Sequence, residues 1–136
     1  MAEERVRAAV EKAVTVHPLL GCRWVPDHGA VCLRPGAPLV PLRAVERTSA
    51  DQWRSVIAEE HAVAFDFEAG PLFRFILLAG DGASDLVVYG QHTVCDGLSL
   101  ASLLRQVLAW SVGVTSDEVH PVEEGRPAIA LVSRPQ

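Results

Sequence analysis

The segment Leu72–Gly97 reads LFRFILLAGDGASDLVVYGQHTVCDG and contains the clearest fold signal in this 136-residue chain. Its two apolar runs, Leu72–Ala79 and Leu86–Gly90, are separated by Gly80–Asp85, a stretch rich in glycine and aspartate. Nearly continuous apolar runs of this length are typical of strands that are covered on both faces. The segment therefore predicts two buried strands joined by a turn.

A helix is predicted directly after these strands. Beyond Gly97 the leucines recur at spacings of three and four residues, which places them on one side of an α-helix. Gly113 suits the end of this helix because glycine readily adopts the left-handed conformation found there. The buried side is expected to carry Leu100, Leu103, Leu104, Val107, Leu108 and Ser111.

The N-terminal half predicts a helix, a hairpin and a second helix. An apolar stripe of valines and alanines runs along Ala2–Val16, and Pro18 ends that helix because it disfavours a helical residue before it. The runs Leu20–Val25 and Ala30–Leu33 flank a turn in which Gly29 can take a positive φ. After a linker and an extended piece around Leu39–Leu42, Thr48 or Ser49 is expected to cap a helix with Gln52 as capping-box partner, and the apolar side of that helix carries Trp53, Val56, Ile57 and Ala64.

This order predicts one α/β domain over residues 1–136, with about three helices layered on a sheet of mostly antiparallel or mixed strands. The tail, residues 114–136, is expected to pack loosely and to hold one short strand at Ala128–Val132. The net charge of −5 argues against a nucleic-acid partner, because few cations are present to contact phosphates.

Membrane insertion and secretion are also not expected. The longest apolar run is far shorter than the roughly 20 residues that a spanning helix needs. The charged N-terminus lacks the apolar core of a secretory signal, which favours a cytoplasmic protein. Cys22 and Cys32 are then expected to be reduced, with a disulfide across the hairpin as the minor alternative. The eleven arginines against one lysine suggest a bacterial genome rich in GC.

The stretch Gln91–Gly97, QHTVCDG, is the candidate for chemistry. It lies between a buried strand and a helix, so a rigid scaffold holds His92 at the edge of a sheet. Histidine is the side chain whose ordinary pKa lies nearest neutral pH, and it can accept a proton from a hydroxyl, amine or thiol. The alternative interpretation is structural: a histidine at a strand end, Asp96 as a helix cap and Gly97 as a turn residue.

Several motifs resemble the superfamily of condensation domains and chloramphenicol acetyltransferase. QHTVCDG is similar to its His-His-x-x-x-Asp-Gly signature, and Asp96–Leu104 to the start of its next helix. Upstream, Phe65–Arg74 (FDFEAGPLFR) looks like the "FDL…GPL.R" segment of condensation domains. His17-Pro18-Leu19-Leu20 is similar to the "RHP.L" that ends the first helix of the family. The resemblance spans nearly the whole chain and implies the N-terminal subdomain of that fold.

The resemblance implies an acyltransferase in which His92 is catalytic. It helps an amine or hydroxyl to attack an acyl thioester carried on coenzyme A or on a phosphopantetheinyl carrier protein, as in natural-product biosynthesis, with no tightly bound cofactor. Asp96 is expected to make a structural salt bridge and Gly97 to line the channel floor. Gln91 replaces the first motif histidine, which alters a structural role without abolishing catalysis.

The larger departure from the family is that only one of its two subdomains is represented. A half-channel cannot by itself exclude water and orient substrates, so a complementary second half or a homo-oligomer is expected to complete the site. The rival hypothesis is a non-catalytic module that binds a carrier protein or ligand with this fold. A third is a fragment of a longer enzyme.

The remaining candidates are expected to be structural. His17 suits a helix end, His28 a turn and Ser99 a helix cap, and the five histidines lack the spacing of metal ligands. His61 is placed in the polar part of the second helix and His120 in the tail. The three tryptophans, Trp24, Trp53 and Trp110, are expected in the core or at a subdomain contact.

Overall fold

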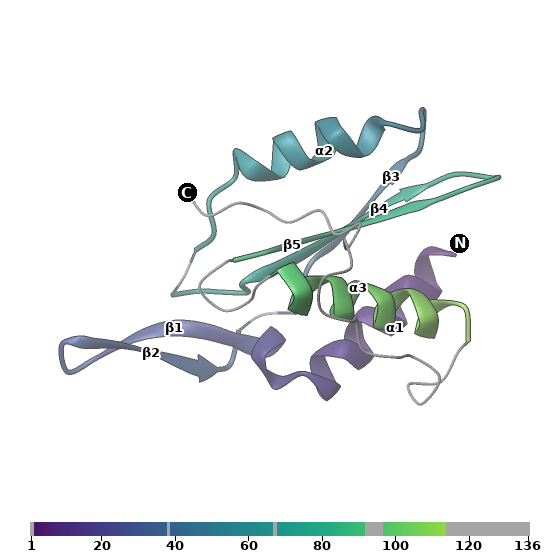
Figure 1. The fold of residues 1–136 in the computed structure, drawn as a ribbon. Coiled ribbons are helices and arrows are strands. Elements are labelled where there is room, and N and C mark those ends of the chain that lie inside the picture. Colours follow the sequence, from purple (N-terminus) through teal and green to yellow (C-terminus); the bar gives the residue numbers. More distant parts are fainter. Residues whose placement is uncertain (1, 38, 67, 92–96, 114–136) are drawn as a thin grey trace.

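The computed structural model describes residues 2–37, 39–66, 68–91 and 97–113 (Figure 1). The predicted tail strand at Ala128–Val132 lies outside these residues. The elements, in chain order, are α1 (Glu3–Val16), a 3-10 helix (Pro18–Gly21), β1 (Cys22–Asp27), β2 (Ala30–Pro35), β3 (Leu42–Glu46), α2 (Gln52–His61), β4 (Phe73–Ala79), β5 (Asp85–Gly90) and α3 (Gly97–Ser111). The three helices and both hairpins are confirmed, whereas β3 begins only at Leu42, the last residue of the extended piece predicted around Leu39–Leu42.

The central sheet has three strands in the order β3-β4-β5. The middle strand β4 pairs parallel with β3 and antiparallel with β5, so the predicted mixture of strand directions is confirmed. β1 and β2 pair with each other as a separate antiparallel ribbon that extends away from the body of the molecule (Figure 1). The structure thus has two small sheets, whereas the sequence analysis predicted a single sheet covered by helices.

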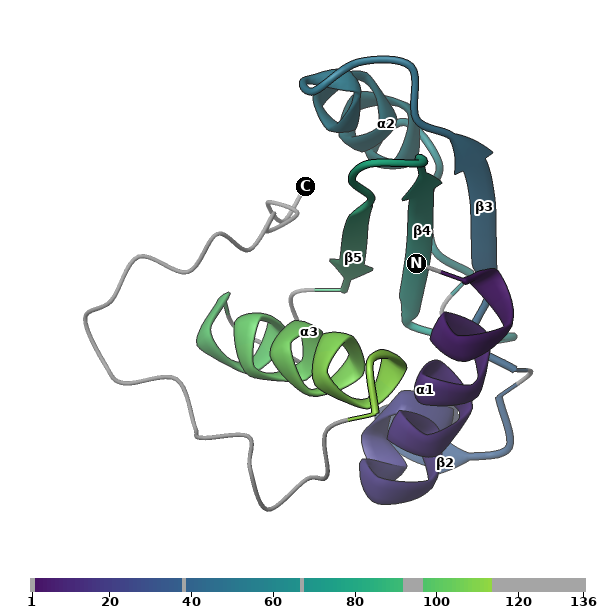
Figure 2. The ribbon, with the colours of Figure 1, turned by 90° about the vertical axis from the view of Figure 1, so that its right-hand side faces the viewer.

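Helices cover both faces of the central sheet. α1 and α3 lie side by side on one face, and α2 lies on the other (Figures 1 and 2). Successive side chains of β4 point to opposite faces of the sheet, which explains why the strand is apolar at nearly every position. Phe75 and Leu77 pack in the cluster with α1 and α3, whereas Ile76 and Leu78 pack in the cluster that contains Val56 of α2. These four β4 side chains are at most 1% exposed, so both faces are buried as predicted.

The α1–α3 pair is the main helical contact of the fold. The predicted stripe of α1 is buried at Val6, Ala9, Val10 and Ala13, and it belongs to the same cluster as the leucines of α3. His17 ends α1 as predicted, and its Nε2 also shares a hydrogen bond with Oε1 of Gln106 on α3. The histidine therefore terminates one helix and joins it to the other.

The β1–β2 turn has two residues with positive φ, His28 at 49° and Gly29 at 82°. These angles suit a tight two-residue hairpin turn, which confirms His28 and Gly29 as turn residues. Cys22 and Cys32 are both free, as expected. They lie opposite Pro35 and Val25 rather than opposite each other, so the register of the hairpin does not bring them together.

The start of α2 differs from the predicted capping box. Asp51 is the N-cap residue and makes no side-chain cap bond, while Ser49 Oγ donates to Asp51 Oδ1 at 3.1 Å. Gln52 does reach back as a capping-box residue does, because its Oε1 accepts the Thr48 N–H at 2.6 Å. Ala64, predicted on the apolar side, lies beyond the end of α2 at His61.

The other apolar residues of α2 and the tryptophans are placed as predicted. Trp53, Val56 and Ile57 belong to the cluster under α2. Trp24 and Trp110 pack against the larger cluster between the sheet, α1 and α3. The tryptophans therefore contribute to the core of the described part, each from the margin of a cluster.

Candidate functional site

The candidate site is the junction between β5 and α3. β5 ends at Gly90 and α3 begins at Gly97; His92 and Asp96 belong to residues 92–96, which lie outside the described part. Both ends of this segment are held firmly. The Gln91 N–H donates to the Leu72 carbonyl at 2.9 Å, and α3 packs along α1. The motif therefore connects two fixed elements of the core.

The described end of the motif corrects one prediction. Ser99 is not a helix cap, because α3 already begins at Gly97 and Ser99 is the third residue of the helix. The side chain of Ser99 is exposed.

The described residues of the second motif, FDFEAGPLFR, lie against the end of β5. Asp66 organises its turn: its backbone carbonyl accepts the Gly70 N–H at 2.8 Å, and its Oδ1 accepts the Ala69 N–H at 3.0 Å. The turn brings the Phe65 ring onto the ring of Tyr89, with 5.7 Å between centroids. Because Tyr89 lies two residues before Gln91, the motif supports the end of the strand that leads to His92.

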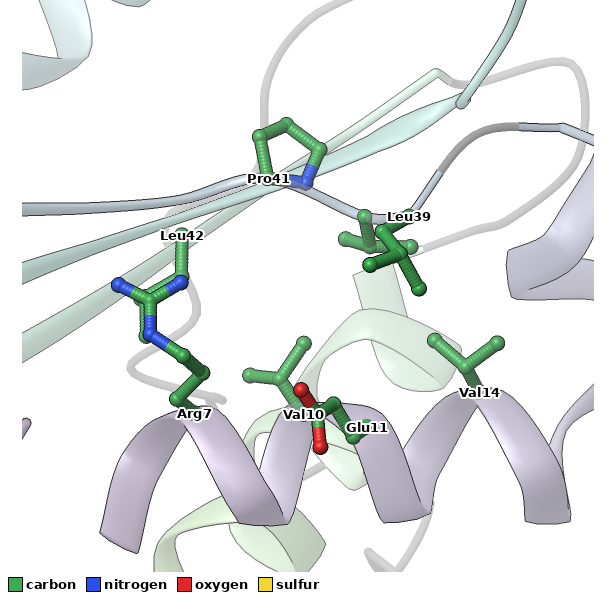
Figure 3. Close-up of a pocket in the computed structure, with 8 residues that line it drawn as sticks. Arg7, Val10, Glu11, Val14, Leu39, Pro41 and Leu42 are labelled. Carbon is green, nitrogen blue, oxygen red and sulfur yellow. The ribbon is translucent and has the colours of Figure 1, made fainter. Parts of the chain in front are cut away.

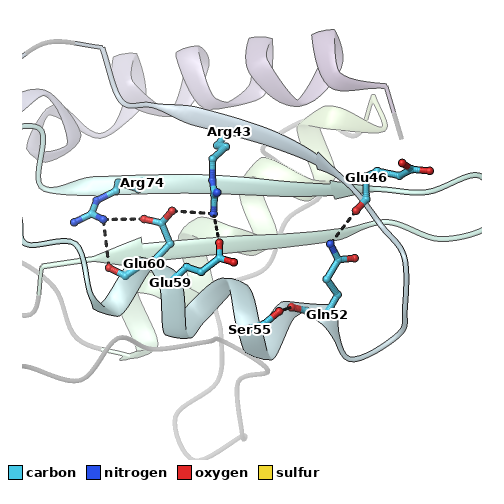
Figure 4. A network of polar contacts seen from close by, with 7 residues as sticks. All are labelled: Arg43, Glu46, Gln52, Ser55, Glu59, Glu60 and Arg74. Atoms are coloured by element: carbon cyan, nitrogen blue, oxygen red, sulfur yellow. Dashed lines mark hydrogen bonds and ion pairs between the residues drawn. The ribbon is translucent and has the colours of Figure 1, made fainter.

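Arg74, the last residue of that motif, is a structural anchor. It is the cross-strand partner of Tyr89, and its guanidinium lies 4.1 Å from the centroid of Phe65. It donates to Glu60 Oε2 at 2.7 Å (Figure 4). It also donates to the Val63 carbonyl at 2.8 Å. These contacts face α2, so Arg74 fastens α2 to the sheet.

Glu60 is the centre of a wider ion-pair network that the sequence analysis missed. Its side chain is only 12% exposed and pairs with Arg74 through Oε2 and with Arg43 through Oε1, the latter at 3.2 Å (Figure 4). Next to it, His61 Nδ1 shares a 2.9 Å hydrogen bond with the Tyr89 hydroxyl. One signal was present in the sequence: a single arginine inside the run LFRFILL must find an anionic partner if the strand is buried.

Replacing Glu60 by glutamine should lower the free energy of unfolding by about 2 kcal/mol, because the largely buried Arg74 loses its charged acceptor and the exposed Arg43 loses one of its two. The matched control is Glu3→Gln, which removes an exposed pair with Arg7 and should cost less than about 0.5 kcal/mol. Urea unfolding followed by circular dichroism measures both. Equal losses in the two variants would contradict the assigned importance of the Glu60 network.

A pocket of about 300 Å³ lies between α1 and the segment that enters β3 (Figure 3). Val10, Val14 and Leu42 give it an apolar lining, and Arg7 at its rim is paired with Glu3. β3 and β5 are opposite edges of the sheet, so this pocket is not part of the β5–α3 junction.

The three described histidines have separate partners. His17 bonds Gln106, His28 bonds Asp27 and His61 bonds Tyr89, and no group of three potential metal ligands occurs in the described part of the chain. None of the described helices has the length and apolarity needed to cross a membrane. His120 lies outside the described residues.

Comparison with known proteins identifies the fold. No protein-family model matches the sequence. No curated protein matches it either. Solved structures do match. The tallysomycin biosynthesis protein TlmII is similar to this chain at 23% identity and a TM-score of 0.68, and the match covers 83% of this chain and 28% of that chain. The epimerization domain of the third module of tyrocidine synthetase B matches at 22% identity and a TM-score of 0.65, over 82% of this chain and 27% of that one.

A third match is a variant of the starter condensation domain of rhizomide synthetase in complex with C8-CoA, at 16% identity and a TM-score of 0.70, covering 90% of this chain and 30% of that chain. This chain therefore has part of the condensation-domain fold, as the motifs predicted. It spans less than a third of the length of each matched structure. Its assignment to the N-terminal subdomain stays a prediction.

Proposed function

We propose that this protein takes part in acyl transfer of the condensation type, with His92 assisting the attack on an acyl thioester. The observation that carries the proposal is the position of QHTVCDG: it connects a buried strand to a helix in a chain with the condensation-domain fold. In the proposed reaction the imidazole of His92 accepts the proton of an amine or hydroxyl. The nitrogen or oxygen then bonds to the acyl carbon, the carbon–sulfur bond breaks, and the thiolate leaves and is protonated.

The other motif residues act as supports in this proposal. Gln91 is held by the hydrogen bond from its backbone N–H to the Leu72 carbonyl, and Asp96 makes a structural salt bridge. Gly97, the first residue of α3, lines the channel floor, where it has no side chain to block the substrate. Their part is to fix the loop so that the imidazole meets the thioester in one orientation, which lowers the entropic cost of reaction.

The proposed acyl donor is a thioester of coenzyme A or of a phosphopantetheinyl carrier protein. A matched rhizomide synthetase domain was solved with C8-CoA, so octanoyl-CoA is the first donor to test. The named neighbours belong to the biosynthesis of tallysomycin, tyrocidine and rhizomide, which supports a role in natural-product biosynthesis. A complementary second half, or a second copy of this chain, is proposed to close the channel.

The test is a thioester turnover assay. The chain is incubated with octanoyl-CoA and an amine acceptor, with and without a separately produced second subdomain from a condensation enzyme, and released thiol and acylated product are measured. Product that depends on this chain supports the proposal. Binding of octanoyl-CoA or an acyl carrier protein in a calorimetric titration, without turnover, favours the non-catalytic module instead. If the chain shows no binding and no turnover, both functions are contradicted.

A further inference from the structure

The pocket between α1 and the segment that enters β3 has apolar walls and a charged rim. Its apolar side chains are Val10, Val14, Leu39, Val40, Pro41 and Leu42. Leu39 is 79% exposed although it borders the pocket, so a bound apolar group would cover a side chain that now faces water. A volume of about 300 Å³ is at the small end of the range for ligand sites, which suits a small molecule rather than a peptide.

Both walls of this pocket are held in place by the fold. α1 forms one wall and packs into the main core cluster. The opposite wall is anchored on both sides of Leu39. Before it, the Ala37 N–H donates to the Gly21 carbonyl at 3.0 Å. After it, the Pro41 carbonyl accepts the Phe75 N–H at 2.9 Å. A site that is formed in advance loses little conformational entropy when a ligand binds.

Two opposite charges stand at the rim, one helical turn apart on α1. Arg7 and Glu11 both line the pocket, and the Glu11 carboxylate lies between Arg7 and Val14 (Figure 3). The Arg7 guanidinium contacts Glu3 at 2.8 Å, whereas the Glu11 carboxylate makes no ion pair with any residue that the structure describes. Both side chains of the Arg7–Glu3 pair are about half exposed, so the pair contributes little and an anionic ligand can compete for the guanidinium.

A guanidinium and a carboxylate beside an apolar pocket require a ligand with three complementary groups. An apolar α-amino acid has all three: a carboxylate that accepts from Arg7, an ammonium that donates to Glu11, and a side chain for the apolar walls. Side chains four residues apart on a helix have Cβ atoms about 5–6 Å apart, so the two charged groups of one amino acid can meet both. A fatty acid or a simple amine would satisfy only one of the two rim charges.

We propose that this pocket binds a free α-amino acid with an apolar side chain, its carboxylate on Arg7 and its ammonium on Glu11. The side chain of the amino acid lies against Val10, Val14 and Leu39. The pocket borders β3, at the sheet edge opposite β5, so this inference does not depend on the proposed acyl transfer. It gives α1 a binding role besides its packing against the sheet.

Titration of the full chain with L-valine, L-leucine and L-phenylalanine tests the proposal, with calorimetry and the methyl resonances of Val10, Val14 and Leu39 as readouts. At least one of the three amino acids is expected to bind and to shift these resonances. Two analogues of the amino acid that binds most tightly are the matched probes: its amide, which lacks the carboxylate, and its N-acetyl form, which lacks the ammonium. Each analogue should bind at least about ten-fold more weakly, because one charge-assisted contact is lost.

Substitutions at exposed positions of α1 test the two rim charges without changing the core. Arg7→Gln and Glu11→Gln should each weaken binding about ten-fold. The matched controls are Arg5→Gln and Glu4→Gln, which remove the same charges from exposed positions of the same helix outside the pocket. The controls should leave the affinity within about two-fold of the parent.

Three results would overturn the proposal. The first is that none of the three amino acids binds, or that binding leaves the methyl resonances of Val10 and Leu39 unchanged. The second is an amide or N-acetyl analogue that binds as tightly as the amino acid itself; this comparison uses the parent chain and does not depend on the folding of any variant. The third is equal affinity in Arg7→Gln and Arg5→Gln, or in Glu11→Gln and Glu4→Gln.

Discussion

Replacing His92 by alanine is expected to lower acyl transfer by at least about 100-fold, because the nucleophile loses the group that accepts its proton. Binding of octanoyl-CoA should change little, since the imidazole is proposed to act on the attacking group rather than on the donor. The measurement is thiol release under saturating donor, combined with calorimetric titration of octanoyl-CoA.

The matched control is His28→Ala. His28 lies on the β1–β2 turn with a side chain that is 98% exposed, far in the sequence from the motif, and its replacement should leave turnover within about two-fold of the parent, the range of a neutral surface change. A His92→Ala variant as active as the His28→Ala variant would remove His92 from the mechanism. Loss of donor binding in His92→Ala would instead assign the histidine to the binding of the thioester.

Replacing Gly70 by alanine should lower the free energy of unfolding by about 2 to 5 kcal/mol. Gly70 has a φ of 64°, a conformation that costs other residues about 1–2 kcal/mol. A Cβ there would also lie 2.8 Å from the Ala37 Cβ and 3.0 Å from the Arg23 Cβ, and relieving such an overlap costs about 1–3 kcal/mol more. The affected contact joins the base of the β1–β2 ribbon to the turn before β4, where Arg23 Nη1 also donates to the Glu68 carbonyl.

Gly29→Ala separates the two causes. Gly29 also has a positive φ, 82°, but no atom lies within 4 Å of the position of its Cβ, so only the backbone cost remains. Chemical unfolding of both variants should show a clearly larger loss for Gly70→Ala. Losses of the same size would mean that the close packing around Gly70 relaxes without cost.

The elements that the sequence predicted best are those whose pattern has one physical solution. Leu72–Ala79 and Leu86–Gly90 are too apolar to face water on either side, and the structure covers them with α1 and α3 on one face and α2 on the other. The leucine spacing after Gly97 and the glycine at residue 113 likewise determined α3 and its end. The motif resemblance predicted the fold because these elements occur in the right order around it.

Pairing between distant segments was much less predictable. β3 gains its length from the parallel ladder with β4, whose partners Leu42 and Phe75 are far apart in the sequence. Thr48 and Ser49 were equally good helix caps by local pattern, but the N-cap residue of α2 is Asp51, and Thr48 contributes only its N–H, which Gln52 Oε1 accepts. The local sequence does not show which strand a segment will pair with, or which arginine a glutamate will bind.

By itself, the sequence determined the helices, the two hairpins, the buried character of β4 and β5, and the strand-to-helix position of QHTVCDG, because each depends on periodicity or turn chemistry within a few residues. Only the tertiary structure decided that Phe65, Arg74 and Tyr89 stack beside the end of β5, that Glu60 joins Arg43 and Arg74, and that α1 packs along α3. Those features arise when segments far apart in the chain are brought into contact. Burial then requires each charge and each polar group to find a partner, and that choice depends on geometry that no local pattern contains.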